Sequence, residues 1–135
     1  MRIFLDANIL FSGAKKGSPL GQFIVFLSKQ AKLITHPHAD CEARRNLELK
    51  RPKWLTGYKA LLKHVQVIDK MSRVAGVKLN EKDCPILYAA VGCQCTHLLT
   101  GDFQHFRHLF GKTIHGVKIV YPMLLAKETG FKPSP

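Results

Sequence analysis

The stretch FLDANIL, residues 4–10, places Asp6 and Asn8 inside an otherwise apolar run. The residues RIFL at 2–5 form a short apolar segment that ends at the aspartate, which is typical of a buried parallel strand. An ionised carboxylate contributes nothing to an apolar core, and burying it without a partner is expensive. Asp6 therefore needs a role other than packing.

Strand-like and helix-like patterns alternate along the rest of the chain. Ser18 fits an N-cap and Pro19 the first position of an amphipathic helix. Further strands are expected at 32–36, 65–69, 96–100 and 117–121, and helices at about 38–49, 54–64, 81–92, in part of 103–110, and from 122 onward. This alternation predicts an α/β fold with a mostly parallel central sheet and helices on both faces, in three layers. We expect one domain over residues 1–130 and a frayed tail over 131–135.

The charge balance is strongly basic. Twenty-one Lys and Arg against nine Asp and Glu leave a net charge of +12, which suits a polyanionic partner such as nucleic acid. No apolar stretch is long enough to span a membrane and no export signal is visible, so we expect a soluble, cytoplasmic protein with no membrane partner. The four cysteines have no familiar metal-site spacing, and reduced thiols are favoured over a structural zinc.

Three of the few acids are expected to converge. Asp6 and Asp102 each follow a predicted strand, and the carboxyl ends of parallel strands meet at one edge of the sheet. Asp83 lies on the apolar face of its predicted helix, where a solvated acid is unexpected. An alternative for Asp83 is a capping role with Asn80, three residues earlier.

A fourth acid comes from the segment HADCEARRNL, which offers Asp40 and Glu42. The two residues lie about 200° apart on a helix, so they cannot share a face, and periodicity does not choose between them. Carboxylates crowded into one crevice would take up protons unless a cation neutralised them. Mg²⁺ or Mn²⁺ is the natural choice for oxygen ligands, and would activate water for attack on a phosphodiester.

The segments FLDANILFSGA, EARRNL, KDCPILYAA and LLTGDFQHF occur in this order over nearly the whole chain. In this respect the sequence resembles the PIN-domain nucleases, including the VapC-type toxins. The resemblance implies that the acids of these segments are catalytic and bind the metal, and it selects Glu42 over Asp40. The implied set is Asp6, Glu42, Asp83 and Asp102. It also implies that Asn8 and Thr100 support the acids by hydrogen bonding, although a turn residue and a strand residue would explain them as well.

The same resemblance implies a Mg²⁺- or Mn²⁺-dependent endoribonuclease that cleaves RNA and forms a homodimer, and in toxin members it implies a cognate antitoxin. Basic side chains are candidates for phosphate contacts, with a solvated surface as the alternative for each one. They are Lys15, Lys16, Arg44 and Arg45, with Arg51 and Lys53 in the stretch KRPKWLTGYK, which matches no family motif. In that stretch, Trp54 and Tyr58 are either base-stacking or core residues.

Two other function classes remain open at this stage. A non-catalytic RNA-binding module on a PIN-like scaffold would explain the basic surface without requiring the acids. A phosphohydrolase with Asp6 as covalent nucleophile would explain the strand followed by an aspartate, but such enzymes typically have a second aspartate where Asn8 stands.

Overall fold

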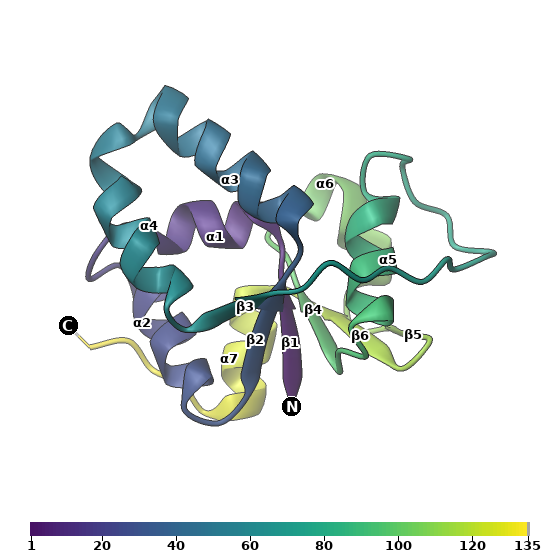
Figure 1. The fold of residues 1–135 in the computed structure, drawn as a ribbon. Coiled ribbons are helices and arrows are strands. Elements are labelled where there is room, and N and C mark those ends of the chain that lie inside the picture. The colour runs from purple at the N-terminus through teal and green to yellow at the C-terminus, as the bar shows by residue number, and fades with distance from the viewer. Residues whose placement is uncertain (135) are drawn as a thin grey trace.

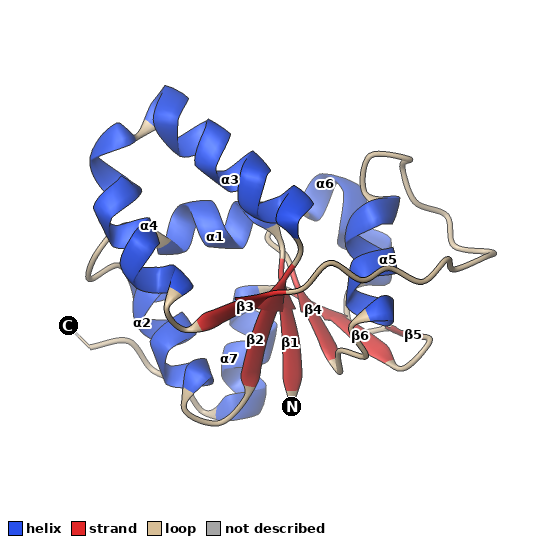
Figure 2. Ribbon diagram, viewed as in Figure 1, coloured by secondary structure: helices blue, strands red, loops and turns tan. Residues whose placement is uncertain are grey.

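One six-stranded sheet organises the computed structural model, which describes residues 1–134 (Figures 1 and 2). The strands follow the order β3-β2-β1-β4-β6-β5, and all are parallel except β5, which pairs antiparallel with β6. Their bounds are β1 Arg2–Leu5, β2 Lys32–Thr35, β3 Val65–Val67, β4 His97–Leu99, β5 Thr113–Ile114 and β6 Val117–Val120. The central strands β1 and β4 are adjacent, although about 95 residues separate them in sequence: Phe4 is level with Leu98.

Helices connect the strands and cover both faces of the sheet. They are α1 Ala7–Gly13, α2 Pro19–Ser28, α3 Pro37–Lys50, α4 Leu55–Leu62, α5 Cys84–Gly92, α6 Phe103–Phe106 and α7 Pro122–Thr129, with short 3-10 turns at Pro52–Trp54 (η1) and Arg107–Leu109 (η2). Figure 1 shows α2 and α7 behind the sheet and α5 in front of it, while α1 and α3 lie above its carboxyl edge. The predicted α/β fold with a mostly parallel sheet in three layers is therefore confirmed.

Local chemistry explains where several elements begin. Ser18 caps α2 as predicted: its hydroxyl accepts a hydrogen bond from the Gly21 amide at 3.1 Å, and Pro19 occupies the first helical position. The helix α1 was not predicted. It follows β1 directly, with Asp6 as its N-cap, and its seven residues are too few for a helical period to be recognised in the sequence.

Two further boundaries differ from the sequence prediction. The helix expected over 81–92 begins at Cys84, after an extended segment from Ile68 that lies against α5. Ser72 in that segment donates its amide hydrogen to the Tyr88 carbonyl at 2.9 Å. At the other end of the chain, Phe131 packs between the rings of Phe23 and Phe26 at 4.9 and 5.1 Å. The packed body therefore extends beyond the expected boundary at residue 130.

Within residues 1–134, no helix has both the length and the apolar character needed to cross a membrane. All four cysteines carry free thiols, and Cys93 and Cys95 are buried.

Candidate active site

The carboxyl edge of the sheet brings Asp6 and Thr100 together from the ends of β1 and β4. Asp6 is 6% exposed. Its Oδ1 accepts a hydrogen bond from the Ala7 amide at 2.7 Å, which caps α1, and its Oδ2 accepts one from the Thr100 hydroxyl at 2.8 Å. The buried carboxylate is thus held by the start of one element and the end of another.

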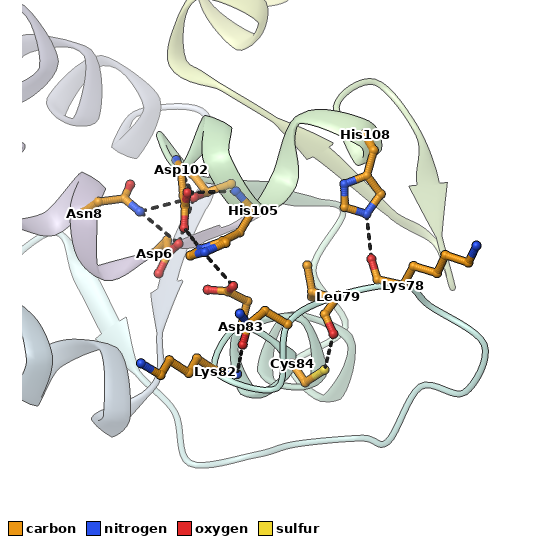
Figure 3. A network of polar contacts seen from close by, with 12 residues as sticks. Asp6, Asn8, Lys78, Leu79, Lys82, Asp83, Cys84, Asp102, His105 and His108 are labelled. Carbon is orange, nitrogen blue, oxygen red and sulfur yellow. Dashed lines mark hydrogen bonds and ion pairs between the residues drawn. The ribbon is translucent and has the colours of Figure 1, made fainter.

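Asn8 completes this arrangement (Figure 3). Its side-chain amide donates to Asp6 Oδ2 at 3.0 Å, and its Oδ1 accepts from the Gly101 amide at 2.8 Å. Thr100 also accepts a hydrogen bond from the Asp102 amide at 3.1 Å. The two predicted supporting residues therefore link the strand end that carries Asp6 to the loop that carries Asp102.

Burial dominates the electrostatics of Asp6. It raises the pKa of this carboxyl group from 3.8 to about 6, and the charge of Glu42 acts in the same direction. The hydrogen bonds from Thr100, Ala7 and Asn8 stabilise the ionised form and lower the pKa, but they do not offset the loss of solvation. Without a cation the site disfavours the ionised form of Asp6, and a cation bound nearby would favour it.

Asp83, Asp102 and His105 form a tight group beside Asp6. One ligand atom from each of the three lies within 4.8 Å of the other two. His105 Nδ1 is 2.8 Å from Asp102 Oδ2 and makes the hydrogen bond with it, while the Asp102 Oδ1 caps α6 by accepting from the His105 amide at 3.1 Å. The same Nδ1 is 3.1 Å from Asp83 Oδ2.

Asp83 is the least satisfied of these carboxylates. It occupies the N-cap position of α5, but its side chain makes no capping hydrogen bond, so the capping alternative does not explain its orientation. Its Oδ2 is buried and, among residues 1–134, makes no hydrogen bond, because His105 Nδ1, which lies at ion-pair distance from it, makes its hydrogen bond with Asp102. Burial raises the pKa of Asp83, the charges of Asp102 and Glu42 raise it further, and His105 lowers it.

All four predicted acids line one cavity of about 630 Å³. Glu42 reaches it from the exposed side of α3. Asp40 does not line the cavity: its Oδ1 accepts hydrogen bonds from the Tyr58 hydroxyl at 2.6 Å and from Arg44 Nε at 3.0 Å. Of these two acids on α3, Glu42 therefore faces the cavity and Asp40 packs against α4.

The donor set fits a hard divalent cation. Carboxylate oxygens predominate, which suits Mg²⁺ or Mn²⁺, and Asp83 Oδ2, which makes no hydrogen bond, is an oxygen that a cation would satisfy. Asp83, Asp102 and His105 are the closest ligand group, and Asp6 and Glu42 line the same cavity without belonging to that group.

Three residues of the cavity were missed by sequence reasoning. His105 lies three residues after Asp102, and the two side chains are brought together only because α6 is helical. Lys50 and Lys82 add positive charge to the cavity lining. Among the predicted basic contacts, Arg44 is engaged by Asp40 and lies over the Tyr58 ring at 5.3 Å, whereas Lys15, Lys16 and Arg45 are exposed.

Comparison with known proteins adds information on the fold. No family model matches the sequence, and no curated protein matches it. The structure is similar to a chain of VapBC2 from Rickettsia felis, which was solved bound to a DNA fragment from the VapBC2 promoter. The match has a TM-score of 0.64 and 15% sequence identity, and it covers 90% of this chain and 98% of that chain. The likeness confirms the expected PIN-like α/β fold.

Proposed function

We propose that this protein is a divalent-metal-dependent endoribonuclease that acts as the toxin of a type II toxin–antitoxin pair. The observation that carries the proposal is the convergence of Asp6, Glu42, Asp83 and Asp102 on one cavity in a chain of net charge +12. A protein that only bound RNA through its basic surface would not need four carboxylates on one cavity, one of them with a buried oxygen that makes no hydrogen bond.

Asp83 and Asp102 would hold Mg²⁺ or Mn²⁺, with Asp6 and Glu42 completing the acidic surroundings. When bound, such an ion lowers the pKa of water and offsets charge on a phosphodiester under attack. Thr100 and Asn8 fix the carboxylate of Asp6 by direct hydrogen bonds. Lys50 and Lys82 bring positive charge to a cavity that must accept a phosphate against four carboxylates.

His105 holds Asp102 from both sides, through its backbone amide and its ring nitrogen. These contacts restrict the Asp102 side chain to one orientation toward Asp83. The role proposed for His105 is therefore to position Asp102.

The toxin assignment and the antitoxin partner are supported by the PIN-like fold, which the protein shares with a chain of a VapBC complex, whereas the homodimer is proposed from the sequence resemblance. Co-expression with the product of the adjacent reading frame tests this part. A stable complex that suppresses ribonuclease activity is expected, and an activity unaffected by that product would contradict the toxin assignment.

The nuclease proposal is tested with purified protein, single-stranded RNA and Mn²⁺ or Mg²⁺. Cleavage is expected with metal and none in excess EDTA. Glu42→Gln should lower kcat/KM by at least about tenfold, which corresponds to about 1.4 kcal/mol of lost transition-state stabilisation. Glu48→Gln is the matched control, because Glu48 lies on the same helix but does not line the cavity. Cleavage that survives EDTA, or equal losses in both variants, would count against the proposal.

Titration of the protein with Mn²⁺ separates the enzyme from the non-catalytic RNA-binding module, which the basic composition alone would also support. Saturable Mn²⁺ binding that Asp83→Asn weakens favours the enzyme. RNA binding without such a metal site favours the module.

A further inference from the structure

A strip of basic and aromatic side chains leads away from the acidic cavity. Phe11, Asn46 and Lys50 line the cavity on the side of α1 and α3 that faces η1. The Phe11 ring packs against Trp54 of η1 with a centroid distance of 5.6 Å. Trp54 in turn lines a second cavity, of about 370 Å³, together with Lys15, Lys16 and Lys53. The two cavities are thus joined through the contact between the two aromatic rings.

The strip is positively charged along its length and contains no acid. Its basic and aromatic residues all fall within 7–39 and 49–68, two segments without a single Asp or Glu. Lys15, Lys16 and Lys53 are exposed, and the Arg51 guanidinium lies over the Trp54 ring at 5.6 Å. A concentration of positive charge next to an acidic cavity complements a chain of phosphates that enters that cavity.

Close packing holds the loop that carries Lys15 and Lys16 against α4. A side-chain β-carbon at Gly57 would lie 2.0 Å from the Ala14 carbonyl oxygen and 3.4 Å from Lys16 Cγ. Only glycine permits this approach, so the KRPKWLTGYK stretch supplies both a lysine and the surface on which the Lys15–Lys16 loop rests. The position of these lysines is therefore built into the packing of α1 and α4.

We propose that this strip, formed by Lys15, Lys16, Lys53 and the Arg51–Trp54 pair, binds the phosphates of a single RNA strand on one side of the cleaved phosphodiester. The identity of the occupant rests on the proposed function, because the strand is the substrate of the acidic cavity. The strip starts one helix length from the acids: α1 has seven residues, or about 10 Å at 1.5 Å per residue. Binding therefore requires a strand longer than the reacting dinucleotide unit.

The direct test is the affinity of the full chain for a fluorescein-labelled 12-nucleotide single-stranded RNA, measured by anisotropy in EDTA, where no turnover is needed. Each phosphate contact to a single strand adds about 0.7 to the slope of log affinity against log salt. Replacing Lys15, Lys16 and Lys53 by alanine should therefore lower the slope by about 2 and weaken binding about a hundredfold at 0.1 M salt. Thermal melting of the variant verifies that it is folded.

The matched control removes the same charge elsewhere. Lys29, Lys32 and Lys112 are exposed and line neither cavity, so their triple alanine variant should bind the RNA nearly as well as the wild type. Equal losses in the two variants, or an unchanged salt slope in the first, would overturn the proposal. Binding of a poly-glutamate peptide with the same affinity and the same dependence on Lys15, Lys16 and Lys53 would also overturn it, in favour of an acidic protein partner.

A cleavage assay separates this inference from the nuclease proposal. A dinucleotide carries one phosphodiester, which the acidic cavity takes, so its kcat/KM should be unchanged in the Lys15, Lys16 and Lys53 variant, while KM for the 12-nucleotide RNA rises. If the wild type binds RNA through the lysines but never cleaves it, the nuclease proposal is wrong and the proposal that the strip binds RNA is supported. If the wild type cleaves RNA and the lysine variant binds RNA normally, the proposal that the strip binds RNA is wrong and the nuclease proposal is supported.

Discussion

The buried carboxyl group of Asp6 predicts an unusual dependence of stability on pH. Burial raises its pKa from 3.8 to about 6 in the folded protein, so the folded state holds the proton more tightly than the unfolded state. The free energy of unfolding should therefore fall as pH rises between these values, because the folded state binds more protons there. A shift of about two units, at 1.36 kcal/mol each, makes this loss about 3 kcal/mol in the absence of metal.

Asp6→Asn isolates this contribution. Asparagine keeps the shape of the side chain and remains a good N-cap for α1, but it carries no titrating charge. Urea unfolding in EDTA at intervals from pH 4 to pH 8 gives the free energy of unfolding of both proteins. Relative to the wild type, the variant should gain about 2.4 kcal/mol between pH 4 and pH 7, since part of the change has already occurred at pH 4.

Glu48→Gln serves as the control, since this carboxylate is exposed on α3. Its difference from the wild type should stay nearly constant over the same range. A constant difference for Asp6→Asn would refute the reasoning, because it would mean that the folded protein does not disfavour the ionised form of Asp6.

The other predictions concern packing, hydrogen bonding and metal. Gly57→Ala places a β-carbon 2.0 Å from the Ala14 carbonyl oxygen, so urea unfolding should show a loss of about 1–3 kcal/mol although alanine is the better helix former; a gain in stability would contradict the packing argument. Thr100→Val removes the hydroxyl that donates to Asp6 and should raise the Asp6 pKa further, so the pH-dependent loss of stability should extend to higher pH. An unchanged pH midpoint would show that this hydrogen bond does not affect the Asp6 pKa. Mn²⁺ at about a hundred times its Kd should stabilise the wild type by about 2.7 kcal/mol at pH 7.5, and Asp83→Asn should abolish most of this shift in thermal melting.

The sequence was sufficient for the parts of the fold that have a clear local signal. The Ser18–Pro19 start of α2 is a capping pattern with a direct physical meaning, and the structure shows the predicted hydrogen bond. The helix α1 has no such signal, because its N-cap is an aspartate embedded in an apolar run and most of its surface is buried. A helix of seven residues also offers too few positions for a periodic pattern to be recognised.

The site shows the same division. Strand ends and one helix face were enough to expect Asp6, Asp83 and Asp102 at one edge, and the structure places them on one cavity. Periodicity could not choose between Asp40 and Glu42, and only the family resemblance selected Glu42. The structure adds the reason for Asp40, because the Tyr58 hydroxyl donates a hydrogen bond to it from α4. No sequence pattern reports such a contact in advance.

The position of β4 next to β1 also bears on how the protein is made. A ribosome releases the chain from its N-terminus, so Asp6 emerges before Thr100, which lies 94 positions later and supplies the hydroxyl that holds Asp6. Before β4 has been synthesised and has docked on β1, neither Thr100 nor Asp102 can join Asp6. A nascent or truncated chain that ends before His97 therefore has no acidic cavity.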